Sequence, residues 1–146
     1  MRLVVQRVKE ARVEAEGRLI GRIGKGLLVF LGIAKTDSFK EAEFLARKIV
    51  ELRVFEDHDG KMNLAAPHVN GAFLVVSQFT VLGNCDKGRR PSFDAAADPV
   101  KGEELYNYFV DQMKKYQVDV ATGRFRAMME VSLVNDGPVT FVIDSP

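Results

Sequence analysis

The pattern of apolar positions predicts strands at the start of the chain. Residues 1–8 are rich in β-favouring side chains, and apolar and charged residues alternate over 11–16. A period of two is typical of a strand with one solvated face. Gly17 ends this segment, so residues 18–24 are expected to return as its hairpin partner.

Two continuous apolar runs, 26–34 and 72–80, predict strands that are covered on both faces. Residues 54–63 predict a short strand with a turn at Asp59-Gly60. The C-terminus predicts strands over about 128–134 and 139–144, joined by Asn135-Asp136-Gly137-Pro138.

One helix is predicted between the two apolar runs. Ser38 and Glu41 have the spacing of a capping box, and Asp37 offers a second possible cap. The apolar residues of this segment then recur at helical spacing, on one face. They are Ala42, Leu45, Ile49 and Leu52.

A second helix is predicted to begin after Asp98, with Pro99 at its first position, where the missing N–H costs nothing. Its buried stripe is expected at Leu105, Phe109, Gln112 or Met113, and Tyr116. Seven to nine strands with only two principal helices favour a single α+β domain, 1–146. Its sheet should be mainly antiparallel or mixed and barrel-like.

Composition narrows the class of protein. The net charge of +1 excludes a strongly basic, histone-like binder, although it allows a local basic patch. The single cysteine, Cys85, excludes an internal disulfide, and the chain has only two histidines, so we expect no metal and no cofactor. No apolar run reaches the roughly 18 residues of a membrane span, and the N-terminus is too charged for a signal peptide. We expect a cytoplasmic protein with no membrane association.

Polar residues close the second apolar run, as Ser77-Gln78-Phe79-Thr80. Such residues often mark the point where a buried strand reaches a cleft. The Thr80 hydroxyl is a possible nucleophile, but no base lies within the motif to activate it. The alternative is an ordinary strand end.

A basic loop follows directly, with Lys87, Arg89 and Arg90 in the segment 87–93 and no acid among them. Arginine forks and loop N–H groups suit phosphate, so this loop is a candidate contact for a nucleic-acid backbone. The alternative is a solvated run of charge.

The third candidate is the segment 135–140, Asn-Asp-Gly-Pro-Val-Thr. By itself it is typical of a hairpin turn. A cis bond between Gly137 and Pro138 would turn two neighbouring carbonyls to the same side, as an acceptor pair for an ammonium group, but only about one X–Pro bond in twenty is cis.

The sequence resembles the D-aminoacyl-tRNA deacylases. The resemblance covers nearly the whole chain, through MRLVVQRV, GRIGKGLLVFLGI, SQFT, KGRRPSF and NDGPVT in that order. It implies hydrolysis of the ester between a D-amino acid and tRNA, by a homodimer with active sites at the interface. The aminoacylated tRNA is the implied partner.

The resemblance also assigns residues. Ser77, Gln78, Phe79 and Thr80 match the SQxT motif of the catalytic site. Asn135, Gly137, Pro138 and Thr140 match the NxGPxT motif, so Gly137–Pro138 should be cis and should enter the partner's site. There its carbonyls would exclude an L-residue, while glycine is admitted.

Two mechanisms are compatible with this resemblance. In the first, Thr80 attacks the ester. In the second, N–H groups near Phe79 and Thr80 polarise the ester while the 2′-hydroxyl of the tRNA assists. The lack of a nearby base favours the second.

The sequence departs from the usual family pattern at Val81-Leu82, Asn84 and Arg126, which leaves the substrate range open. Two other functions remain alternatives: an RNA-binding module without catalysis, and a Thr/Ser hydrolase of small esters.

Overall fold

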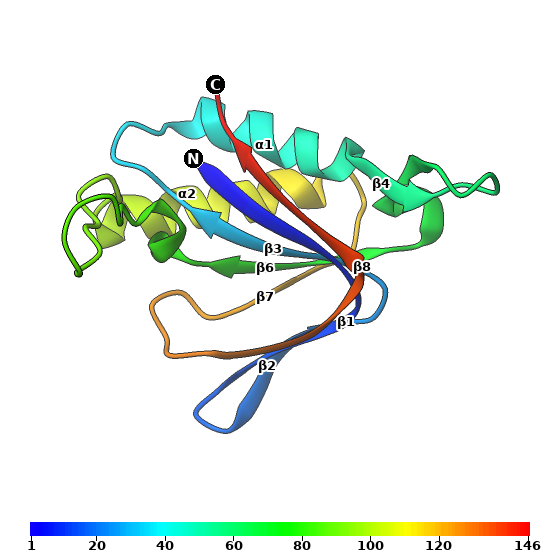
Figure 1. Ribbon diagram of the computed structural model, residues 1–146, viewed down its shortest axis with the longest axis horizontal. Helices are drawn as coiled ribbons and strands as arrows, with labels where there is room; N and C mark the ends of the chain where they lie inside the picture. The colour runs from blue at the N-terminus through cyan, green and yellow to red at the C-terminus, as the bar shows by residue number, and fades with distance from the viewer.

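The computed structural model describes residues 1–146 and contains eight strands, two α-helices and two short 3₁₀ turns (Figure 1). The strands are β1 (Arg2–Ala15), β2 (Arg18–Ile23), β3 (Gly26–Gly32), β4 (Arg53–Glu56), β5 (Met62–Ala65), β6 (Ala72–Ser77), β7 (Val120–Thr122) and β8 (Glu130–Asp144). The helices are α1 (Phe39–Glu51) and α2 (Pro99–Lys114), and the 3₁₀ turns are η1 (Ala66–Val69) and η2 (Phe79–Leu82).

The main sheet has six strands and is organised around β1. This strand pairs antiparallel with β2, β3 and β8, whereas β3, β6 and β7 run parallel to one another. Strand β8 follows β1 from the pair Glu14–Glu130 to the pair Arg2–Asp144, and β2 lies beside β6 and β7 without pairing with them. The mixed sheet is therefore nearly closed into a barrel, as predicted; β4 and β5 form a separate hairpin.

Both helices cover one face of the sheet (Figure 1). The larger core lies between them and β1, β3 and β6, where Leu3, Val5, Phe73 and Phe109 are fully buried. A smaller core fills the inside of the curled sheet around Val8, Val13 and Leu74. No helix is long and apolar enough to cross a membrane.

The predicted helix starts are confirmed. Ser38 caps α1 by accepting from the N–H of Lys40, and the Glu41 carboxylate accepts from the N–H and hydroxyl of Ser38 at 2.7 and 2.6 Å. The hydrogen bond from the Ser38 hydroxyl holds the pKa of Glu41 below its usual value. Asp98 caps α2, with Pro99 at its first position.

Three details of the prediction were wrong. Asp37 is no cap: it is buried and accepts from the N–H of Ala34 and from the Met1 ammonium. Tyr116 is 43% exposed, because α2 ends at Lys114, and its buried face instead includes Tyr106 and Val110. Strand β7 lies in a segment for which the apolar pattern predicted nothing.

The parallel pairing of β3 with β6 depends on Gly26. A Cβ atom there would lie 1.8 Å from the carbonyl oxygen of Ala72 and 2.7 Å from its carbon, so the backbones would have to separate. Gly24, two residues earlier, has no atom within 4 Å of its Cβ position.

We expect Gly26→Ala to lower the free energy of unfolding by about 2–3 kcal/mol, as overpacking in a rigid core does. Gly24→Ala is the matched control and should change it by less than about 0.5 kcal/mol. Urea unfolding of both variants measures the two values. Equal stability of the two variants would contradict the close approach of β3 and β6.

Candidate functional site

The segment Ser77–Thr80 lies where β6 leaves the sheet. Ser77 pairs with Leu31, and the N–H of Gln78 donates to the Leu31 carbonyl at 2.8 Å. The chain then turns, because the N–H of Val81 donates back to the Gln78 carbonyl and starts η2. The strand predicted over 72–80 therefore ends at Ser77, and both Phe79 and Thr80 lie exposed on a 3₁₀ turn.

The turn leaves main-chain donors free. The first N–H groups of a helix have no partner within it, and no side chain caps η2. The N–H groups of Phe79 and Thr80 donate to no other group of the chain. Two adjacent, unpaired donors at the end of a buried strand can polarise a carbonyl oxygen.

The Thr80 hydroxyl has no base beside it. Its one side-chain partner is Gln78, whose Nε2 donates to Thr80 Oγ1 at 3.0 Å. His58 lies exposed in the turn between β4 and β5, and Nδ1 of His68 accepts from the N–H of Ala65. Neither imidazole lines the cavity, and the one carboxylate that does, Asp98, is engaged as the cap of α2. No base is hydrogen-bonded to the Thr80 hydroxyl to activate it as a nucleophile.

Arg2 fastens η2 to the sheet. Its guanidinium donates to the Val81 carbonyl at 3.3 Å and to both carboxylate oxygens of Asp144 at 2.7 and 3.0 Å. The hydrogen bond from Arg2 also keeps the pKa of the Asp144 carboxyl below its usual value. The role of Arg2 is not predictable from the sequence, because an Arg in a strand gives no sign of a contact 79 positions away.

The basic loop after η2 is anchored at several points. The Phe93 ring packs edge-on against Phe79 with centroids 5.0 Å apart, and Asn84 and Ser92 form a β-bridge across the loop. The N–H of Lys35 donates to the Ala95 carbonyl, which ties the loop to the segment after β3. All three predicted cations are exposed: Lys87, Arg89 and Arg90.

A cavity of about 850 Å³ opens beside Ser77–Thr80. This volume lies within the roughly 300–1,000 Å³ of ligand pockets. Its walls are the end of β6, the loop residue Phe93, the start of α2 and the segment 125–131, and most of them are apolar. The wall 125–131 is not predictable from the sequence, because only the fold brings this segment to the end of β6.

The segment 135–140 is no hairpin. The two C-terminal strands predicted over 128–134 and 139–144 are one strand, β8, paired with β1 along both halves. Between the pairs Val8–Asn135 and Gln6–Thr140, β8 has four residues opposite the single Arg7 of β1, and the three additional residues form a bulge (Figure 1). Within the bulge the Gly137–Pro138 peptide is cis and exposed.

Side chains on both strands hold this bulge. Asn135 closes it, because its amide oxygen accepts from the N–H of Val139 at 2.8 Å and its nitrogen donates to the Val139 carbonyl and the Thr140 hydroxyl. Arg7 is buried and donates to the carbonyls of Asp136 and Val54 at 3.0 and 2.7 Å. Gly137 has φ +141°, and a Cβ atom would lie 2.6 Å from Val139 Cγ2, so no other residue fits without strain.

The two predicted motifs are not brought together within one chain. In the register of the sheet, Ser77 aligns with Leu3 of β1, whereas the bulge aligns with Arg7 of β1, about 13 Å further along that strand. Three strand spacings across the sheet separate them as well, and neither Gly137 nor Pro138 lines the cavity. No group of three or more His, Cys, Asp or Glu side chains is placed to hold a metal ion.

Known proteins match this chain along nearly its whole length. The family model described as "D-Tyr-tRNA(Tyr) deacylase" matches residues 4–144. The chain is 57% identical to the D-aminoacyl-tRNA deacylase of Geobacter sp. (strain M21) over 100% of this chain and 98% of that protein. It is 53% identical to that of Thermosipho africanus, over 99% and 97%.

Two solved structures have the same fold. One, titled "c-Myc DNA Unwinding Element Binding Protein", superimposes with a TM-score of 0.93 at 42% identity, over 100% of this chain and 99% of that one. The other, a probable eukaryotic D-amino acid tRNA deacylase, gives 0.84 at 16% identity, over 98% of both chains. The family match and the relatives that align along the full chain show that this chain belongs to the D-aminoacyl-tRNA deacylase family.

Proposed function

We propose that the protein hydrolyses the ester between a D-amino acid and the terminal adenosine of tRNA in the cytoplasm, and that it rejects L-aminoacyl-tRNA. Hydrolysis of D-aminoacyl-tRNA is the function of the family. The observation that carries the proposal for this chain is the pair of free N–H groups at Phe79 and Thr80, at the mouth of a cavity whose lining has no imidazole and whose one carboxylate, Asp98, is engaged as the cap of α2.

The chemistry follows from those donors. The ester carbonyl oxygen accepts from the N–H groups of Phe79 and Thr80, which stabilise the negative charge that develops there. Water adds to the carbonyl carbon, the bond to the ribose oxygen breaks, and that oxygen takes a proton. The neighbouring 2′-hydroxyl of the tRNA assists the proton transfer, since no side chain of the site is placed to do so. Gln78 orients the Thr80 hydroxyl.

Selection of the D-amino acid over the L-amino acid is assigned to the Gly137–Pro138 peptide of a second copy of this chain. The bulge is exposed and lies far from the cavity of its own chain, so only another protomer can bring it to Phe79. The carbonyls of Gly137 and Pro138 accept from the substrate ammonium and leave no space for an L side chain, while Arg7 and Asn135 hold the bulge through the neighbouring residues Asp136 and Val139. Glycine carries no side chain to exclude, so it is accepted.

A homodimer also suits the surface of β1 and β8. Val4 and Val142 are paired neighbours that point away from the main core, and Val142 is 63% exposed. Phe79 is 54% exposed. Apolar side chains that gather on a sheet face are typical of an interface between subunits.

The basic loop is assigned to the tRNA backbone. Lys87, Arg89 and Arg90 are exposed, and none of them forms an ion pair with a carboxylate of the chain. Free cations on an anchored loop suit phosphate contacts, whose strength falls as salt rises. Binding of RNA without catalysis and hydrolysis of small esters without RNA remain the competing functions.

The activity itself is tested with D-Tyr-tRNA and L-Tyr-tRNA. We expect hydrolysis of the D-form to be at least about 100-fold faster, since a clash with rigid backbone costs several kcal/mol. Release of labelled tyrosine measures both rates. Equal rates would refute chiral selection, and an intact D-ester in the presence of bound tRNA would favour a binding module.

Thr80→Ala separates the two mechanisms. If the main-chain N–H groups provide the catalysis by stabilising the developing negative charge, the variant should keep kcat within about tenfold of the parent, because only the hydroxyl is lost. The measurement is single-turnover hydrolysis of D-Tyr-tRNA, with mass spectrometry of the quenched parent enzyme. Loss of turnover together with a trapped acyl-enzyme would establish Thr80 as the nucleophile.

Mixed dimers test whether the bulge acts across the interface. Gly137→Ala deforms the bulge, and a variant with Lys87, Arg89 and Arg90 all changed to Ala weakens tRNA binding. Each homodimer should lose at least about tenfold in kcat/KM, since small misplacements of a site are costly. A heterodimer with one subunit of each kind would hold one intact site, so it should recover about half of the parent activity.

Failure to recover would show that the bulge serves its own chain. Gly24→Ala in place of Gly137→Ala is the control, because it leaves the bulge unchanged. Sedimentation velocity of the parent verifies that the protein is a dimer at the assay concentration.

A further inference from the structure

Arg126 is the one charged side chain of the cavity wall that no other residue engages. It lines the cavity in the segment 125–131 and forms no ion pair. Arg124, two residues earlier, lies outside the cavity and pairs with Glu16 at 4.0 Å. The other charged residue of the lining, Asp98, accepts from the N–H groups of Val100 and Lys101 as the cap of α2.

The local backbone fixes the position of Arg126. The N–H of Ala127 donates to the Arg124 carbonyl and closes a turn in which Arg126 has φ +61°. Left-handed backbone is uncommon for residues other than glycine and persists where the surroundings determine it. The preceding Phe125 provides this support, because its ring lies over Gly102 and 5.9 Å from the ring of Tyr106 in α2.

The chemistry of the substrate limits what a free guanidinium can meet here. An aminoacyl ester presents an ammonium group, a neutral ester, a neutral ribose and a neutral base. The ammonium would be repelled, so for an amino acid with an uncharged side chain, such as D-Tyr, the phosphates that link the last nucleotides are the one anionic partner. A guanidinium fork matches two oxygens of a phosphate.

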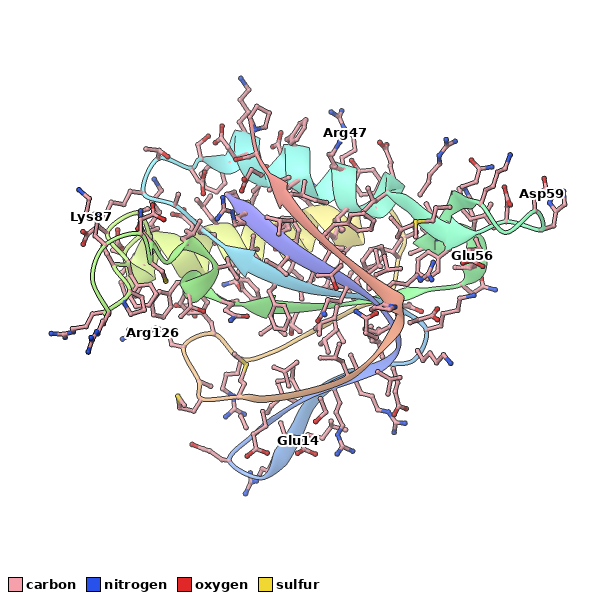
Figure 2. All side chains as sticks on the ribbon, viewed as in Figure 1. Glu14, Arg47, Glu56, Asp59, Lys87 and Arg126 are labelled. Atoms are coloured by element: carbon pink, nitrogen blue, oxygen red, sulfur yellow. The ribbon has the colours of Figure 1, made fainter.

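We propose that Arg126, from the wall of the cavity, binds a backbone phosphate of the single-stranded 3′ end of aminoacyl-tRNA. The inference rests on the proposed function and names a contact for its substrate. Figure 2 shows Arg126 at the end of the molecule that also carries Lys87. The strand that enters the cavity is thus held between the basic loop and Arg126, which orients the ester toward Phe79.

Two substrates separate this role from a structural one. At 0.1 M salt, Arg126→Ala should lower kcat/KM for D-Tyr-tRNA roughly fivefold, through KM, and make its salt dependence shallower by about 0.7 in the logarithmic slope. For 3′-O-D-tyrosyl adenosine, which has no phosphate, the same variant should match the parent. An equal loss on both substrates, or no loss on D-Tyr-tRNA, would overturn the contact.

Three further variants keep the test decisive. Arg126→Gly removes the side chain while suiting the left-handed backbone, so it should reproduce the loss even if Arg126→Ala folds poorly. Arg126→Lys keeps the charge and should restore part of the affinity, whereas Arg124→Ala is the matched control and should act as the parent does.

If the parent leaves D-Tyr-tRNA intact, the proposed function fails. Fluorescence anisotropy with labelled tRNA then decides the phosphate contact by itself: a loss of affinity in Arg126→Gly supports it, and equal affinity overturns it.

Discussion

The pairing of β8 with β1 is the constraint on which the rest of the structure depends. Strand β1 pairs with β8 along nearly its whole length while its two halves bond to different neighbours, β3 and β2. One strand that belongs to two parts of the sheet must curl, and the curl produces both cores and the nearly closed barrel. The additional residues of β8 cannot fit into this ladder, so they are expelled as the bulge.

Much of this fold was predictable because its signals are local. The capping pairs at Ser38 and Asp98 lie within three residues of the groups that they cap, and the apolar runs that became β3 and β6 need only neighbouring residues to be recognised. The segment 135–140 was different. Its composition is typical of a turn, and only the long-range pairing with β1 converts it into a bulge within a continuous strand.

The candidate site divides in the same way. The motif at Ser77–Thr80 and the cations at 87–90 were recognised because they are contiguous in sequence. Arg2, Arg7 and the wall at 125–131 act through contacts with distant segments, which the local sequence pattern predicts poorly. Arg7 did leave one weak signal: it occupies the inward-facing register of Leu3 and Val5, where a charged residue must find partners. The expected roles of the site residues came from the family resemblance, whereas the distances between the motifs are known only from the fold.

The bulge also constrains the number of residues in β8. Side chains alternate between the two faces of a strand and carbonyls between its two edges, so one residue added or removed between Glu130 and Asn135 would reverse the orientation of every following position. Val131 and Leu133 would then exchange places with their polar neighbours, and the segment at Gly137–Pro138 would be presented out of phase with Arg7. The number of residues between Glu130 and Asn135 is therefore constrained together with their chemistry, because that number sets which carbonyls and side chains face Arg7 and the smaller core.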